Sequence, residues 1–220
     1  MEVCKGVEML HLNFHGNMIH PTLLWDQDLA VLIDTGFPGQ MEDLRAAMDN
    51  VGVSFDKLQA VILTHQDMDH IGSLPEILKQ CGTKVKVYAH ELDKPYIQGE
   101  IPLIKDSHLE NPPKGKVDET LVDGQQLPFC GGIRVIHTPG HTPGHISLYL
   151  CQSKTLIAGD SMYSVDGMLG GIHAPTTLDM EAARRSLNKY ADFDIEAVVC
   201  YHGGLSNTNV KEQIAGLSKS

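Results

Sequence analysis

Short apolar segments alternate with amphipathic ones along most of the chain. Residues 29–36 (LAVLIDTG) have the pattern of a buried strand that runs into a glycine turn, and residues 58–64 (LQAVILT) have the pattern of a second buried strand. Between them, Met41, Leu44 and Met48 recur at the spacing of one helical face. This order of strand, helix and strand is typical of an α/β protein.

The same alternation continues toward the C-terminal end. We expect further strands over 84–89, 133–138, 146–151, 154–159 and 197–200, with the third and fourth of these forming a hairpin. We expect further helices whose apolar faces carry Ile71, Leu74 and Leu78, then Ala183, Leu187 and Tyr190, and finally Val210, Ile214 and Leu217. The polar, proline-rich stretch over 90–120 is predicted to be a loop with one short helix. No linker divides the chain, so a single domain over 1–220 is predicted.

Composition and charge narrow the classes of function. The chain has 220 residues and a net charge of −11 without a basic cluster, which argues against a nucleic-acid substrate and favours a small molecule. Its five cysteines are an odd number without a Cys-x-x-Cys pair, as expected of a reduced, cytoplasmic protein. The apolar runs are too short to cross a bilayer and the first residues lack the apolar core of a secretory signal, so no membrane association is expected. The sequence carries no signal for an oligomeric state.

The closest grouping of potential metal ligands in the sequence follows the second predicted strand. The segment THQDMDHIG places His65, Asp67, Asp69 and His70 within six residues. Neither a strand nor a helix points all four side chains one way. A turn between the two can instead aim the first pair at one metal ion and the second pair at another. Two-metal hydrolytic sites need such a compact source of ligands, because their ions lie only about 3.5–4 Å apart.

Further ligand candidates follow strands later in the chain. The rigid loop HTPGHTPGHIS can present His141 to a metal, although His137 and His145 are equally suitable by residue type. Asp160 follows an apolar strand and a glycine, where a carboxylate can bridge two cations, and His202 ends the last predicted strand. Because ligands of layered α/β proteins gather where strands end in loops, we expect these residues to belong to one site.

Taken together, these motifs resemble the metallo-β-lactamase superfamily. Its pattern is an early Asp, a His-x-His-x-Asp-His cluster, a later His, a bridging Asp and a final His. The matching elements here are IDTG, HQDMDH, TPGHTPGH, AGD and YHGG, in that order. The resemblance implies an αββα sandwich of two mixed β-sheets flanked by helices. It also implies a binuclear metal centre, with one ion held by His65, Asp67 and His141, the other by Asp69, His70 and His202, and Asp160 as the bridge.

The early Asp of this pattern corresponds to Asp34 in the IDTG element. The resemblance implies that it orients a metal ligand without touching the metal. A turn-forming Asp ahead of Thr-Gly is the alternative, and the sequence favours neither.

The chain departs from the superfamily pattern at one ligand. Asp67 stands where most relatives have the second His of the cluster. A carboxylate is a harder donor than an imidazole and brings a full negative charge, which shifts the preference from zinc toward iron or manganese. Flavodiiron proteins of the superfamily carry a carboxylate at this position and bind iron. Zinc is the first expectation for the two divalent ions because it is frequent in the hydrolytic relatives, with iron or manganese as the alternatives.

The resemblance predicts a hydrolase that cleaves an ester, lactone or thioester bond of a small molecule with a hydroxide held between two metal ions. Asp69 is also placed to steer the attacking water. Tyr163, three residues after Asp160, has the spacing of a tyrosine in the acyl-homoserine lactonases of the superfamily and could donate a hydrogen bond to the substrate, or else be a structural tyrosine. His173 is expected either beside the substrate or in an exposed loop.

The same residues also allow other functions. A non-haem diiron redox protein is suggested by Asp67, but the chain leaves no room for the flavin domain that delivers electrons in such proteins. A β-lactam hydrolase uses the same chemistry, but a periplasmic enzyme of that kind needs a secretory signal. A nuclease is disfavoured by the acidic charge, and a non-catalytic metal-binding scaffold by the full set of ligands.

Overall fold

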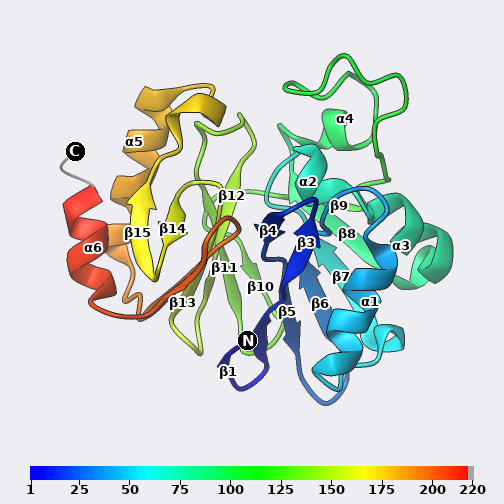
Figure 1. Ribbon diagram of the computed structural model, residues 1–220, viewed down its shortest axis with the longest axis horizontal. Coiled ribbons are helices and arrows are strands. Elements are labelled where there is room, and N and C mark those ends of the chain that lie inside the picture. The colour runs from blue at the N-terminus through cyan, green and yellow to red at the C-terminus, as the bar shows by residue number, and fades with distance from the viewer. Residues whose placement is uncertain (218–220) are drawn as a thin grey trace. The chain divides into compact units, whose positions relative to one another are not determined.

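The computed structural model describes residues 1–217 and forms two compact units, Met1–Leu121 and the residues from Val122 onward. Each unit combines one large β-sheet with helices (Figure 1). The expectation of a single domain over 1–220 stays a prediction, and its last three residues lie outside the described part. Among residues 1–217, no helix has both the length and the apolar character that a bilayer crossing demands.

The first unit is built on a seven-stranded mixed sheet in the order β1-β2-β5-β6-β7-β8-β9. These strands are β1 (Glu2–Cys4), β2 (Val7–Met9), β5 (Thr22–Trp25), β6 (Ala30–Ile33), β7 (Leu58–Ile62), β8 (Lys86–His90) and β9 (Glu119–Leu121). The pairs from β1 to β6 are antiparallel and those from β6 to β9 are parallel. Because β6 and β7 run parallel, the residues that follow them, Asp34 and His65, leave the sheet at the same edge.

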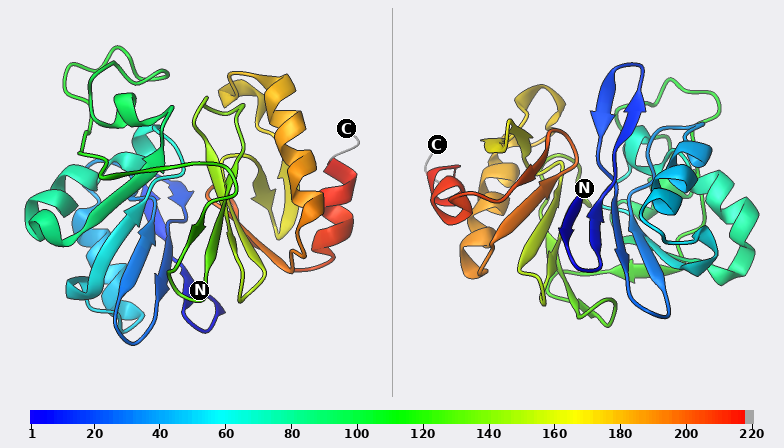
Figure 2. Two further views of the ribbon diagram at one scale, coloured as in Figure 1. Left: turned by 180° about the vertical axis from the view of Figure 1, so that it is seen from behind. Right: turned by 60° about the horizontal axis from the view of Figure 1, so that its bottom comes forward.

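The remaining elements of the first unit are a hairpin and short helices. They are β3 (Leu12–Phe14), β4 (Asn17–Ile19), α1 (Met41–Asn50), α2 (Met68–Ile71), α3 (Leu74–Cys81) and α4 (Lys94–Ile97). Helix α1 buries Met41, Leu44 and Met48, as its apolar spacing predicted. Helices α1 and α3 lie on the same side of the sheet in both views of Figure 2.

The helix expected to carry Ile71, Leu74 and Leu78 is instead two helices, α2 and α3, which is a correction to the sequence interpretation. The break falls at Gly72 and the residue after it. A Cβ atom at Gly72 would lie 2.2 Å from the backbone of Phe37, so only glycine allows the two segments to approach this closely. Pro75 then lies in the first turn of α3, where its missing N–H is tolerated.

The second unit contains a six-stranded mixed sheet in the order β10-β11-β12-β13-β16-β17. Its strands are β10 (Gln126–Leu127), β11 (Ile133–His137), β12 (Ile146–Leu150), β13 (Thr155–Gly159), β16 (Ala197–Cys200) and β17 (Gly204–Ser206). Only the pair β13 and β16 is parallel within this sheet as described. The expected hairpin is confirmed as the antiparallel pair β12 and β13.

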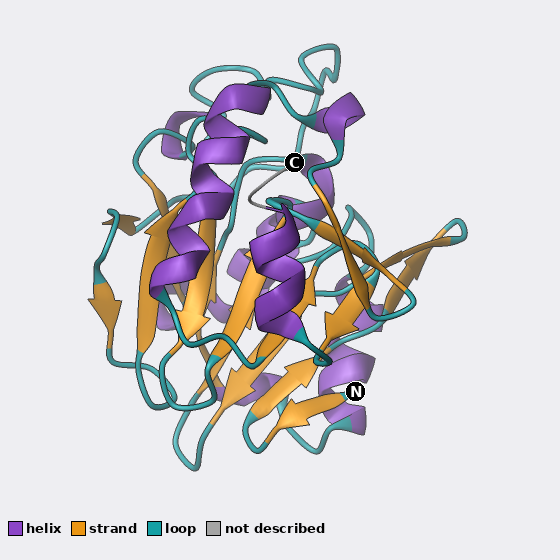
Figure 3. Ribbon diagram, turned by 90° about the vertical axis from the view of Figure 1, so that its left-hand side faces the viewer, coloured by secondary structure: helices purple, strands orange, loops and turns teal. Residues whose placement is uncertain are grey.

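Two helices and a small ribbon complete the second unit. They are α5 (Met180–Asn188), α6 (Val210–Leu217), β14 (Tyr163–Val165) and β15 (Met168–Gly171). Leu187 of α5 and Ile214 of α6 share one buried cluster with Leu156 of β13 and Val198 of β16. Figure 3 views this layer with the helices in front of the strands. The cluster anchors β13 and β16, the strands that are followed by Asp160 and His202.

Candidate metal centre

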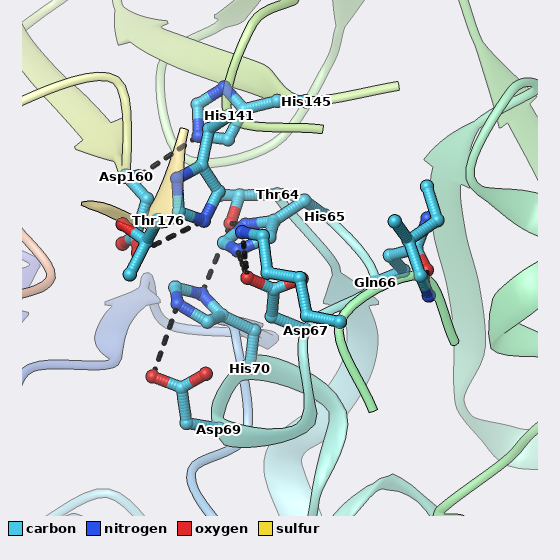
Figure 4. Close-up of polar contacts among 12 residues, drawn as sticks. Thr64, His65, Gln66, Asp67, Asp69, His70, His141, His145, Asp160 and Thr176 are labelled. Carbon is cyan, nitrogen blue, oxygen red and sulfur yellow. Dashed lines mark hydrogen bonds and ion pairs between the residues drawn. The ribbon is translucent and has the colours of Figure 1, made fainter. Parts of the chain in front are cut away.

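Four candidate ligands of the first unit lie together just past the end of β7. His65 Nε2 is 3.3 Å from Asp67 Oδ2, and His70 Nε2 is 3.6 Å from Asp69 Oδ2. The rings of His65 and His70 are themselves neighbours, with centroids 3.9 Å apart. Both imidazoles are fully buried, whereas the two carboxylates keep some exposure to solvent. Figure 4 shows the Asp67 side chain directed toward His65 and the Asp69 side chain directed toward His70.

The backbone between β7 and α2 produces this grouping. Asp67 is extended and directly precedes α2, and its carbonyl accepts the backbone N–H of His70 at 2.9 Å. His65 and Asp67 therefore belong to the turn, while Asp69 and His70 belong to the first helical turn. The turn between strand and helix that the motif predicted is confirmed.

Asp34 orients the two imidazoles from behind. Its Oδ1 accepts the Thr64 N–H at 2.8 Å, and its Oδ2 accepts both the Thr64 hydroxyl at 2.8 Å and the Nδ1–H of His70 at 2.9 Å. Because the Thr64 hydroxyl donates to Asp34, its oxygen accepts the Nδ1–H of His65 at 3.0 Å. Both rings thus carry their proton on Nδ1 and present the Nε2 lone pair to the carboxylates, which is the tautomer that a metal ligand requires. Asp34 was expected either to orient a metal ligand or to form a turn, and these hydrogen bonds are those of an orienting residue.

In the second unit, Asp160 lies between two histidines. Its Oδ2 is 3.4 Å from His141 Nε2 and 3.4 Å from His202 Nε2. His141 is buried, whereas the side chain of His202 is 43% exposed. A single carboxylate oxygen at equal distance from two imidazole nitrogens is the arrangement expected of a ligand shared by two cations.

The hydrogen bonds of the HTPGHTPGHIS loop separate its three histidines. His145 Nε2 accepts the backbone N–H of Asp160 at 2.9 Å, and its Nδ1–H donates to the Thr138 hydroxyl at 2.8 Å. His137 Nε2 donates to a backbone carbonyl of the same loop at 2.9 Å. The histidine that faces the Asp160 carboxylate is therefore His141, while His145 holds the backbone of Asp160 in place.

A chain of buried hydroxyl groups continues from this loop. The Ser147 hydroxyl lies 3.2 Å from that of Thr138 and 2.8 Å from that of Tyr190, and Tyr190 donates to Ser161 at 2.6 Å. Burial raises the pKa of Tyr190 to about 12, so the phenol remains a donor at neutral pH. These contacts give the segment around Asp160 a rigid support.

The four imidazole–carboxylate contacts made through Nε2 fit a shared metal ion better than a hydrogen bond. Their N···O separations run from 3.3 to 3.6 Å, beyond the usual range of about 2.7–3.2 Å for hydrogen bonds. Two ligands bound at about 2.0–2.2 Å from one tetrahedral ion lie about 3.4 Å from each other. The described residues therefore hold His/Asp clusters consistent with divalent metal ions. Nitrogen and oxygen donors of this kind suit zinc, iron and manganese.

Tyr163 and His173 pack against each other in the second unit. Tyr163 begins β14 and is half-buried, and its ring meets that of His173 edge-on, with centroids 6.0 Å apart. A Cβ at Gly170 would lie 2.3 Å from the Tyr163 ring, so this glycine makes room for the tyrosine. The side chain of His173 is exposed. The catalytic role of Tyr163 stays a prediction.

Lys105 is a candidate functional residue that the sequence interpretation missed. Its ammonium lies 2.5 Å from Asp67 Oδ2, in an ion pair that joins residues 38 positions apart. Burial, followed by the charge of Asp67, raises the pKa of the adjacent Asp106. Lys105 belongs to the stretch between α4 and β9, which has no hydrophobic periodicity, so no local signal marks it.

Comparison with known proteins identifies the family to which this chain belongs. The family model of the metallo-beta-lactamase superfamily matches residues 16–202. The probable metallo-hydrolase YflN of Bacillus subtilis (strain 168) is 33% identical to this chain over 229 residues, which cover 92% of this chain and 85% of YflN. The hydroxyacylglutathione hydrolase of Aeromonas salmonicida is 27% identical over 82% of this chain and 59% of that enzyme.

Solved structures support the fold. The crystal structure of the metallo-beta-lactamase family protein TTHA1429 from Thermus thermophilus matches with a TM-score of 0.75 at 21% identity, covering 99% of this chain and 80% of that chain. The α/β fold with two mixed sheets and flanking helices, which the motifs implied, is thereby confirmed.

Proposed function

Because this chain belongs to the metallo-β-lactamase superfamily, we propose that it is a metal-dependent hydrolase that cleaves an ester, lactone or thioester bond of a small molecule. The observation that carries the proposal is the set of imidazole Nε2–carboxylate pairs spaced at 3.3–3.6 Å, a spacing expected of two ligands that share one ion. The similarity to a hydroxyacylglutathione hydrolase supports a thioester among the substrates. The net charge of −11 favours a small molecule over nucleic acid.

The proposal assigns seven side chains to two ions. One ion would be held by His65, Asp67 and His141, the other by Asp69, His70 and His202, and Asp160 would contribute to both. Two features within the units support this division. The turn before α2 separates His65 and Asp67 from Asp69 and His70, and Asp160 Oδ2 faces two imidazoles at equal distance. Zinc is the first candidate metal, and the carboxylate of Asp67 makes iron or manganese the alternatives.

The chain's own groups have distinct tasks in this scheme. Two bound divalent ions would supply a water of lowered pKa and a positive field for a polarised carbonyl. Asp69 keeps 19% of its side chain exposed, so its carboxylate can orient an attacking water by accepting a hydrogen bond. The Tyr163 phenol is proposed to donate a hydrogen bond to the carbonyl oxygen or the leaving group. Asp34 and His145 hold the ligand side chain and the ligand backbone that they contact.

Metal analysis followed by a substrate screen tests this proposal. The chain is purified without added metal, its metal content is measured, and the metal-free protein is then restored with Zn²⁺, Mn²⁺ or Fe²⁺. We expect two divalent ions per chain and turnover of a chromogenic ester, a lactone or a hydroxyacyl thioester only after metal is restored. Hydrolysis that proceeds equally without metal would contradict the proposal.

A non-haem diiron redox protein is the second candidate, because Asp67 supplies a carboxylate where imidazole is usual. Iron-loaded protein that reduces oxygen or nitric oxide, but hydrolyses none of these substrates, would favour it. Turnover of a β-lactam in preference to esters would instead identify a β-lactam hydrolase. The same screen therefore separates the three activities.

A further inference from the structure

Lys105 is held beside the one ligand position at which this chain departs from the superfamily pattern. Its Nζ lies 2.5 Å from Asp67 Oδ2, and the same oxygen lies 3.3 Å from His65 Nε2. One carboxylate oxygen thus faces both an ammonium group and the imidazole nitrogen proposed to bind metal. The two side chains of the ion pair are only 20% and 11% exposed, so water screens their charges weakly.

The neighbouring residues fix this contact. Gln66, directly before Asp67, accepts the backbone N–H of Ile104, directly before Lys105, at 2.9 Å. The backbone N–H of Gln66 donates to Asp93 Oδ2 at 3.0 Å, and both Gln66 and Asp93 are fully buried. Figure 4 shows Gln66 turned away from the Asp67 carboxylate. The hydrogen bond between Ile104 and the buried side chain of Gln66 therefore holds the loop that carries Lys105 next to the HQDMDH segment.

The fixed position of Lys105 changes the charge that Asp67 brings to the proposed metal site. An imidazole ligand is neutral, whereas Asp67 adds a full negative charge to the site. An ammonium group on the same carboxylate oxygen cancels that charge and draws electron density away from a bound cation. It also repels a divalent ion directly. The pair Asp67–Lys105 then presents a net charge of zero, as a histidine would.

We propose that Lys105 is the counter-charge of Asp67 and that it lowers the affinity of this site for divalent cations. The inference rests on the proposed function, because it requires Asp67 to face a metal ion. Lys105 acts through Asp67 and is a positioning and charge-tuning residue, with no part in the reaction itself. Without it, the carboxylate would keep its full negative charge and would bind the ion more tightly than it does in the pair.

Metal titration of a Lys105→Met variant tests the proposal. Methionine keeps the length of the side chain and removes its charge. We expect its apparent dissociation constant for Zn²⁺ and for Mn²⁺, measured by competition with a chromophoric chelator, to fall about tenfold. Lys105→Arg keeps the charge and should stay close to the wild-type value.

Lys116→Met is the matched control. Lys116 lies in the same loop and pairs with Asp118 at 2.8 Å, but its side chain is 77% exposed. The same charge change there should leave metal affinity unaltered, and thermal unfolding of each metal-free variant checks that it folds. If the wild type binds metal and Lys105→Met binds it equally or more weakly, the inference about Lys105 is wrong while the proposed function stands. A wild-type chain that binds no divalent ion would overturn both.

Discussion

Replacing Asp34 with asparagine isolates the role of the group behind the metal ligands. Asp34 is 1% exposed and accepts hydrogen bonds from the Thr64 N–H, the Thr64 hydroxyl and the Nδ1–H of His70. An asparagine has one oxygen and one NH₂ group, so in either orientation at least one of these donors faces another donor. The backbone φ of Asp34 is 61°, a conformation that asparagine adopts as readily as aspartate. The substitution therefore changes hydrogen bonding with little added backbone strain.

The expected effect follows from those contacts. A hydrogen bond to a buried charged group contributes about 1.5–3 kcal/mol, so we expect the metal-free protein to lose stability of that order. His70 then loses the partner that keeps its proton on Nδ1, and the tautomer with a protonated Nε2 cannot bind a metal ion through that nitrogen. Removal of such an orienting partner lowers metal affinity about 10–100-fold, or about 1.4–2.7 kcal/mol.

Chelator competition and thermal unfolding measure the two effects separately. Asp43→Asn, on the exposed face of α1, makes the same change in charge away from the cluster and should leave both quantities near the wild-type values. Metal affinity of Asp34→Asn within about twofold of the wild type, in a folded protein, would refute the orienting role.

Further outcomes are expected at other positions. Asp160→Ala should lose metal and activity together, and full metal occupancy with unchanged turnover would count against a shared ligand. Tyr163→Phe should keep its metal and turn over substrate at least about tenfold more slowly, whereas an unaltered rate would make Tyr163 structural. Burial acts to raise the pKa of Asp123, but hydrogen bonds from the His137 N–H and from Lys189 outweigh it and hold this pKa below its usual value. The resulting stabilisation is present above the unfolded pKa of about 4 and is lost as pH falls through the lower folded pKa. The stability difference between the wild type and Asp123→Asn in urea should therefore shrink between about pH 6 and pH 3, and a constant difference would contradict this.

Elements with continuous apolar runs were predictable because burial alone determines them. The expected strand over 197–200 is β16 itself, and β7 ends within two residues of its predicted end. The strands β1 to β5 went unpredicted because most have only three residues, too few to establish a period. The break between α2 and α3 at Gly72 could not be predicted, for a different reason. It depends on the close approach of Phe37, a contact that no local pattern encodes.

Some features of the candidate site were likewise predictable from the sequence, and others required the structure. The HQDMDH cluster is visible because its ligands are consecutive, and the turn that separates them follows from the strand before and the helix after. The choice of His141 over His145 required the hydrogen bonds that occupy both nitrogens of His145. Lys105 could not be found from the sequence, because its partner Asp67 is 38 residues away and an isolated loop lysine carries no signal.

In the proposed metal centre, side chains from successive strand ends would converge on two cations. Anomalous diffraction from crystals of the zinc-loaded protein measures this directly. We expect two ions about 3.5–4 Å apart, with Asp160 bound to both and with His65 and His70 on different ions. A single ion, or ions bound away from these residues, would contradict the proposed binuclear centre.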